Sequence, residues 1–167
     1  SNSSLESIAM PALEEAGTQF YVTSNSSLES IILSSLIEVG DDFNVDSNYS
    51  LDEISMPVLE EVGSSFNTQW NDSLTTIDAS ELSSISGQLY LYHNDDLETA
   101  DLSSLTDIGS SLNIGSNYAL DVLDLDALVE IDGSLEFTNN DDLITFDLPA
   151  LVDIGGSMNI NNNDSMT

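Results

Sequence analysis

The chain has 167 residues, of which 40% are apolar, and it contains no cysteine. It carries 31 acidic residues, one histidine and no lysine or arginine, which gives a formal net charge of −31. Without side-chain cations it cannot neutralise nucleic-acid phosphates or anionic lipid headgroups, and no apolar run is long enough to span a bilayer. The lack of cysteine excludes disulfides, thiolate metal ligands and a cysteine nucleophile.

The sequence repeats with an unbroken period of 23 residues. The stretch "NSSLESIAMPALEEAGTQF" (residues 2–20) returns as "NYSLDEISMPVLEEVGSSF" (residues 48–66), with another copy between them. A fixed period of this size predicts a solenoid whose turns stack on one another. We expect one invariant column to lie at an inward corner and to bond the backbone of neighbouring turns: Asn2, Asn25, Asn48, Asn71, Asn94, Asn117, Asn140 and Asn163.

Within each repeat, the apolar spacing predicts short strands separated by corners, with no helix. Steps of two, as in residues 20–22 and 77–79, indicate strand alternation. A fixed φ suits a corner at one column, which holds Pro11, Pro57 and Pro149. We expect a second corner to be turned by glycines with positive φ, at Gly17, Gly40, Gly63 and Gly109. The prediction is one all-β domain over residues 1–167, a parallel stack of seven turns, which we interpret as a segment of a longer array.

The stretch "SLNIGSNYALDVLDLDALVEIDGSLEFTNNDDL" (residues 111–143) resembles leucine-rich repeats, and more narrowly the repeats of receptor L domains. Such repeats occur in receptor ectodomains of the insulin and epidermal-growth-factor types and in lipid-anchored fungal cell-wall proteins. The resemblance implies a right-handed parallel β-solenoid outside the cell, at the cell surface or in the wall, used for adhesion, ligand binding or wall structure. The chain departs from the family in having no cysteine-rich caps and no basic residues.

Two acidic columns are candidate cation sites. One holds Glu15, Glu38, Glu61, Asp107, Glu130 and Asp153, and the other holds Asp78, Asp101, Asp124 and Asp147. Stacked strands would place neighbouring carboxylates about 4.8 Å apart, where they repel by roughly 1 kcal/mol even in water. Ca²⁺, which prefers carboxylate oxygens, is the candidate cofactor. The alternative is a solvated acidic surface that binds no specific ion and keeps the protein soluble.

An aromatic cluster is the candidate ligand-binding site, formed by Trp70, Tyr90, Tyr92 and His93. Trp70 and His93 occupy the same column, so we expect their rings to stack in adjacent turns. Aromatic faces on a surface of serine, asparagine and glutamine are typical of sites for sugar rings or for a protein partner. The alternative is that these rings only cover a strand.

Five asparagines begin N-x-S/T sequons and are candidate N-glycosylation sites: Asn2, Asn25, Asn48, Asn71 and Asn163. All five belong to the inward column. The remaining members of that column, Asn94, Asn117 and Asn140, are assigned a purely structural role. Burial in the corner and crowding between glycans one turn apart both argue against modification.

Three functional classes follow from these features. We favour a structural or adhesive segment of an extracellular surface protein or fibre. A ligand-binding ectodomain using the aromatic cluster is the alternative. An enzyme of the polysaccharide-cleaving β-helix kind is disfavoured, because the carboxylates recur by period and no basic group is available for a transition state. The expected partners are cations, glycans, basic proteins and further copies that meet end to end through open strand edges.

Overall fold

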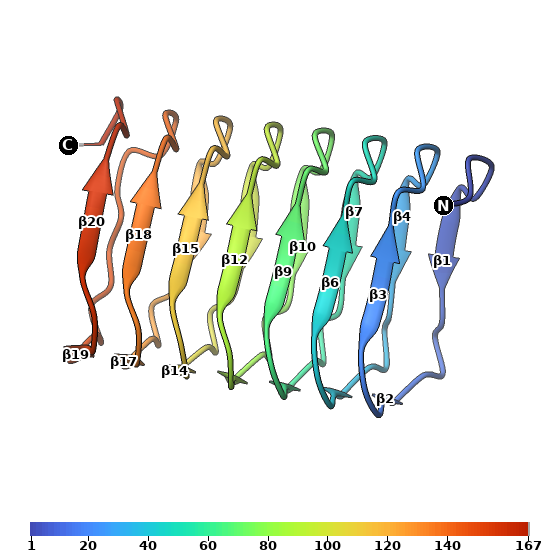
Figure 1. The fold of residues 1–167 in the computed structure, drawn as a ribbon, viewed down its shortest axis with the longest axis horizontal. Helices are drawn as coiled ribbons and strands as arrows, with labels where there is room; N and C mark the ends of the chain where they lie inside the picture. The colour runs from blue at the N-terminus through green and yellow to red at the C-terminus, as the bar shows by residue number, and fades with distance from the viewer. Residues whose placement is uncertain (167) are drawn as a thin grey trace.

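A computed structural model of the chain describes residues 1–166 and contains three parallel β-sheets wound into one solenoid (Figure 1). The first sheet contains β1 (Ser7–Ala9), β4 (Ser30–Ile32), β7 (Glu53–Ser55), β10 (Thr76–Asp78), β13 (Thr99–Asp101) and β16 (Val122–Asp124). The second contains β2 (Glu15–Ala16), β5 (Glu38–Val39), β8 (Glu61–Val62), β11 (Ser84–Ile85), β14 (Asp107–Ile108), β17 (Glu130–Ile131) and β19 (Asp153–Ile154). The third contains β3 (Phe20–Thr23), β6 (Phe43–Asp46), β9 (Phe66–Gln69), β12 (Leu89–Tyr92), β15 (Leu112–Gly115), β18 (Leu135–Thr138) and β20 (Met158–Asn161).

Each strand pairs in parallel with its counterparts one repeat earlier and one repeat later. Ser7 pairs with Ser30 and Phe20 with Phe43, and the same shift of one repeat continues through each sheet. In Figure 1 the third sheet points up at the front, the first sheet points down behind it, and the chain advances from right to left, which makes the coil right-handed. The predicted seven-turn β-solenoid is confirmed. Residues 1–166 contain no helix with the length and apolarity needed to cross a membrane.

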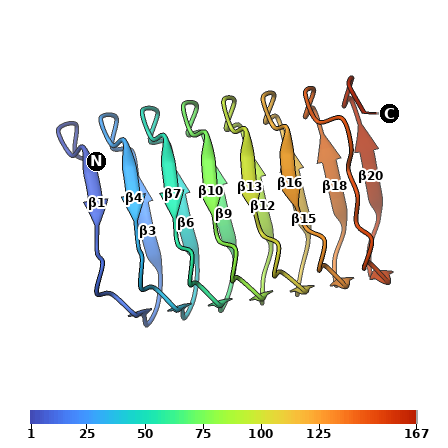
Figure 2. The same cartoon turned by 180° about the vertical axis from the view of Figure 1, so that it is seen from behind.

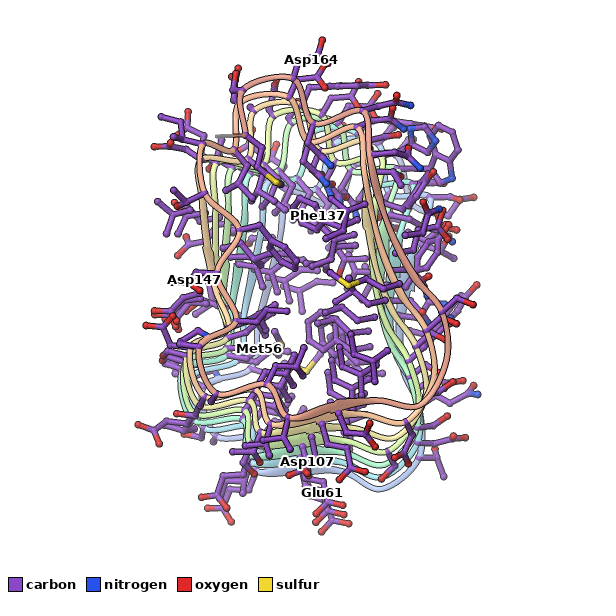
Figure 3. All side chains as sticks on the ribbon, turned by 90° about the vertical axis from the view of Figure 1, so that its left-hand side faces the viewer. Met56, Glu61, Asp107, Phe137, Asp147 and Asp164 are labelled. Atoms are coloured by element: carbon purple, nitrogen blue, oxygen red, sulfur yellow. The ribbon has the colours of Figure 1, made fainter. Side chains whose placement is uncertain are left out.

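The core is a strip of apolar columns enclosed by the three sheets. Figure 3 looks along the stack and shows Met56 and Phe137 inside it, whereas Glu61, Asp107, Asp147 and Asp164 point outward. Phe20, Phe43 and Phe66 stack face to face through three turns, with ring centroids 5.1 and 4.8 Å apart. A single turn could bury little of this surface alone, so the turns stabilise one another.

The asparagine column lies at the inward corner, as expected. Asn48, for example, is fully buried, and its Oδ1 accepts the N–H of Asn25 at 3.0 Å while its Nδ2 donates to the carbonyl of Val22 at 3.1 Å. The same pattern repeats with Asn71, Asn94, Asn117, Asn140 and Asn163. The side chain of each of these asparagines therefore bonds a backbone N–H and a backbone carbonyl of the preceding turn.

The expectation that glycines turn a corner with positive φ was wrong. No glycine among the described residues has positive φ. The positive-φ column is the residue before each asparagine: Ser24, Ser47, Trp70, His93, Ser116, Asn139 and Asn162. Several of the glycines instead lie close to the turn before, since a Cβ at Gly40 would lie 2.7 Å from the carbonyl oxygen of Gly17, although Ser86 and Asp132 fill the same column in other turns. These glycines permit close approach between turns.

The proline column occupies a β-turn, as expected for a corner. Pro11 and Pro57 follow the first residue of turns closed by hydrogen bonds from Leu13 N–H to the Met10 carbonyl (3.2 Å) and from Leu59 N–H to the Met56 carbonyl (3.1 Å). The fixed φ of proline suits this second position, and no ladder N–H is lost.

The first sheet ends one turn before the other two. Residues 145–147 are not a strand, whereas the second and third sheets continue into β19 and β20. Figure 2 shows this part of the chain as an irregular thread beyond β16. Phe146 stands in a column of smaller side chains and stacks on Phe137, from the opposite side of the core, at 4.2 Å. Two phenylalanine rings thus face each other across the core where the first sheet is interrupted.

Candidate functional site

The acidic column on the second sheet is aligned by strand pairing. Its six carboxylates are exposed and project away from the core, as Glu61 and Asp107 do in Figure 3. The pairing places its members one above another in the order Glu15, Glu38, Glu61, Ser84, Asp107, Glu130 and Asp153. The predicted ladder of carboxylates is therefore present, with a gap at Ser84.

The second acidic column has a structural role that its sequence pattern did not reveal. The Oδ1 of Asp101 accepts both the N–H (3.1 Å) and the hydroxyl (2.7 Å) of Ser103, and Asp78 binds Ser80 in the same way. Asp124 accepts the N–H of Asp126 at 3.2 Å. These carboxylates hold the β-turn that follows the first sheet, whereas Asp147 is exposed and lies outside the strands.

The carboxylate columns do not converge on a metal site. Across residues 1–166, no group of three or more acidic or histidine side chains is arranged to hold a metal ion. Neighbours in the columns are instead spaced along the rod at the separation of paired strands. Such an arrangement attracts cations through its field. The Ca²⁺ hypothesis therefore lacks a preformed site in this part of the chain.

Three of the five sequon asparagines, Asn25, Asn48 and Asn71, are buried in the ladder, whereas Asn2 is exposed and Asn163 is partly buried. Asn48 and Asn71 are fully buried and Asn25 nearly so. The Nδ2 atoms of Asn48 and Asn71, which would carry a glycan, donate to the carbonyls of Val22 and Val45. Glycosylation of either residue requires these bonds to be broken, which disfavours modification of the folded protein.

The aromatic cluster is assembled by two adjacent turns. Trp70 follows β9 and His93 follows β12, and their rings stack with centroids 3.9 Å apart and planes 15° from parallel. The ring of Tyr92 meets His93 edge-on at 4.8 Å, and Tyr90 packs beside Tyr92 at 5.3 Å. The four residues predicted to form one cluster do so.

The backbone beneath this cluster is in an uncommon conformation. Trp70 and His93 have φ values of 54° and 52°, in the left-handed region, where serine and asparagine fill the other positions of the column. Serine and asparagine can stabilise such corners with short polar side chains, but tryptophan gains no such bond. Trp70 is also 44% exposed, although one face of its ring packs on His93. Non-glycine residues held in the left-handed region are frequent at binding sites.

Gly115 belongs to the cluster and was not identified from the sequence. It lies one turn beyond Tyr92 in the third sheet, and a Cβ at Gly115 would collide with the ring of Tyr92. Every other position of this column carries a side chain. The sequence does contain a signal for this role of Gly115, because a glycine stands one repeat after Tyr92 in a column of larger residues.

The surroundings of the cluster are acidic. The pKa of Asp95 is raised above 3.8, chiefly by partial desolvation of this exposed residue and then by the nearby carboxylate of Asp72, while His93 opposes the rise. Partial burial raises the pKa of the Tyr90 hydroxyl above 10.0, with contributions from Tyr92 and Glu136. Negative charge thus surrounds the exposed rings, and the chain supplies no lysine or arginine to balance it.

Two open hollows lie away from the aromatic rings. One, of about 510 Å³, is bordered by Glu98, Asp121 and Asp142 among others, and one of about 340 Å³ is bordered by Ile37 and Val58 among others. A ligand of the aromatic cluster would therefore bind on an open surface.

The described chain is thus a parallel β-solenoid with acidic faces and one exposed aromatic cluster. No family model matches this sequence, and comparisons with curated proteins and with solved structures return no match. The resemblance to leucine-rich repeats therefore rests on the repeat pattern alone, whereas the parallel β-solenoid is observed directly.

Proposed function

We propose that this chain is a structural or adhesive repeat segment of an extracellular surface protein, related to leucine-rich repeats of the receptor L-domain type. The observation that carries the proposal is the continuous pairing of strands, which repeats one cross-section along the rod (Figure 1). A rod of this kind holds attached groups at a distance set by the number of turns. The leucine and asparagine columns, which resemble those of surface proteins, support the extracellular location.

The acidic surface suits such a rod. Paired strands bring neighbouring carboxylates to about 4.8 Å, where each pair repels by roughly 1 kcal/mol in water. Dissolved salt outside the cell screens this repulsion, and the net charge of −31 keeps neighbouring rods soluble and apart. We therefore include cation stabilisation in the proposal and exclude nucleic acid as a partner.

Changing the number of turns tests the structural role. Deletion of residues 25–47 removes one complete repeat and leaves the aromatic cluster intact. The variant should fold and be about 4.8 Å shorter, and duplication of the same residues should lengthen the rod equally; small-angle scattering measures both. Loss of the fold in both variants would contradict a modular rod.

Surface labelling tests the location. An antibody against the folded rod should label intact cells of the source, and protease added outside should remove the signal. A signal that appears only after the cells are made permeable would refute the surface assignment.

A ligand-binding role for the aromatic cluster is the second candidate. It is favoured by one observation, the stack of exposed Trp70 on His93 at positive φ. Because Trp70 is the only tryptophan, its fluorescence reports directly on binding. Titration with soluble glycans and basic peptides tests this role, and no change with any of them would remove the candidate while leaving the rod proposal intact.

A further inference from the structure

The indole of Trp70 has one covered face and one open face. Strands β9 and β12 are paired in register, so Trp70 and His93 occupy matching positions and stack. On the other side, β6 and β9 are also paired in register, which places Ser47 at the matching position of the preceding turn. A serine side chain is too short to cover an indole. Because Trp70 is 44% exposed and stacks on His93 through one face, we take the face directed toward Ser47 as the one available to a ligand.

Carboxylates flank this open face. Asp46 precedes Ser47 and pairs with Gln69, the residue before Trp70, and the hydroxyl of Ser47 donates to the Oδ1 of Asp46 at 2.9 Å, which fixes the carboxylate at this corner. Asp72 follows Trp70 by two residues and is exposed. The site therefore combines the negative face of an aromatic ring with carboxylates that have no internal cation as a partner, an environment that favours a positively charged ligand.

The shape of the site selects among cations. Its rings stack or meet edge-on, so their faces do not form an aromatic cage of the kind that encloses a tetrahedral ammonium group. A planar guanidinium can instead lie flat on a single indole and direct N–H groups sideways to a carboxylate. A sugar ring could also lie on the indole. Its neutral hydroxyl groups, however, are attracted to the surrounding carboxylates less strongly than a cation is.

We propose that the open face of Trp70 is a docking site for an arginine side chain of a basic protein partner, with Asp46 accepting hydrogen bonds from its guanidinium. This inference rests on the second function proposed above, binding at the aromatic cluster. The acidic rod steers a basic surface toward itself without selecting a position. Trp70 and Asp46 then select where one arginine binds.

The test uses the whole chain and three probes: a capped glycine peptide with one central arginine, the same peptide with lysine, and a neutral cello-oligosaccharide. About 0.3 M NaCl suppresses nonspecific attraction to the acidic faces. Trp70 fluorescence and its indole N–H resonance should shift with the arginine peptide, and the lysine peptide should bind at least about threefold more weakly.

Three variants make the test specific. Trp70→Ser introduces the residue that Ser47 and Ser116 already provide in the same column at positive φ, so the variant should fold at least as stably as the parent. Its affinity for the arginine peptide, measured from backbone amide resonances, should fall by at least about fivefold. Asp46→Asn should reduce the preference for arginine over lysine. Tyr21→Ser, which removes an exposed ring elsewhere on the third sheet, is the matched control and should bind like the parent.

The outcomes separate the proposals. Equal binding of the two peptides, or unchanged affinity in Trp70→Ser, would overturn the arginine assignment. A shift caused by the oligosaccharide and not by the arginine peptide would make the cluster a glycan site, so that the second function stands and this inference fails. If no probe perturbs Trp70, both fail, and the structural function of the rod is unaffected.

Discussion

Thr68 is the only polar residue in a core column that otherwise holds valine, leucine, isoleucine and phenylalanine. It is fully buried, and its hydroxyl has no hydrogen-bond partner. Thr68→Val should therefore stabilise the fold by about 1 to 2 kcal/mol, because a buried unsatisfied hydroxyl is removed with little change in shape. Urea unfolding measures the change. In the control Thr23→Val, where the hydroxyl lies near that of Ser24, no gain is expected; equal effects in both variants would refute the explanation.

Asn94 tests the buried ladder. Its side chain accepts the N–H of Asn71 at 3.3 Å and donates to the carbonyl of Thr68 at 3.0 Å. Asn94→Ala leaves the N–H of Asn71 without a partner and removes one of the bonds to the Thr68 carbonyl, so we expect a loss of about 1 to 3 kcal/mol. Asn2→Ala, at the exposed beginning of the same column, should cost less than about 1 kcal/mol. Similar losses in the two variants would show that the ladder contributes little.

Asp95 provides a test by pH. Its pKa is raised above 3.8 in the folded protein, so the folded state binds this proton more tightly than the unfolded state does. The contribution of Asp95 to the free energy of unfolding is therefore fully present at pH values well below 3.8, and it is lost as the pH rises through the raised pKa. Asp95→Asn should raise the melting temperature near neutral pH and leave it unchanged in strong acid. Glu81→Gln removes one charge elsewhere; an equal rise in that variant would attribute the effect to net charge.

At the scale of single elements, the interrupted first sheet can be restored. Phe146→Ile places in the seventh turn the side chain found at Ile31, Ile54 and Ile77. With the facing phenylalanines separated, residues 145–147 should pair with β16. Hydrogen exchange of their amides should slow by about tenfold, equivalent to about 1.4 kcal/mol of local stability. Phe137→Ile removes the other ring and should act in the same direction; unchanged exchange in both variants would mean that something else prevents the pairing.

The elements also show what a period can and cannot predict. A fixed repeat identifies which residues become neighbours, so the asparagine ladder and the stack of Trp70 on His93 were predicted correctly. It does not identify the backbone conformation of a column. Positive φ was assigned to the glycines for this reason, although it belongs to the column of Ser47 and Trp70. The period also does not reveal the hydrogen bond from the Ser103 hydroxyl to the Asp101 carboxylate, because both residues belong to the same repeat.

At the scale of the whole molecule, the acidic faces predict a dependence on salt. Screening by NaCl should raise the melting temperature, because neighbouring carboxylates repel. CaCl₂ at equal ionic strength should add no saturable transition, since residues 1–166 contain no group of three acidic side chains arranged around an ion. Calorimetry at matched ionic strength separates the two effects. A saturable rise at submillimolar Ca²⁺ would show specific coordination and restore the Ca²⁺ hypothesis.

The asparagine ladder gives the molecule a direction of assembly. The Asn48 side chain bonds the Asn25 N–H and the Val22 carbonyl, so residues synthesised later secure the turn made before them. A chain that leaves the ribosome or crosses a membrane with its N-terminus first can therefore lock each turn as the next asparagine emerges. At any moment only the most recently added turn lacks its asparagine hydrogen bonds, so the rod can fold turn by turn from its N-terminus.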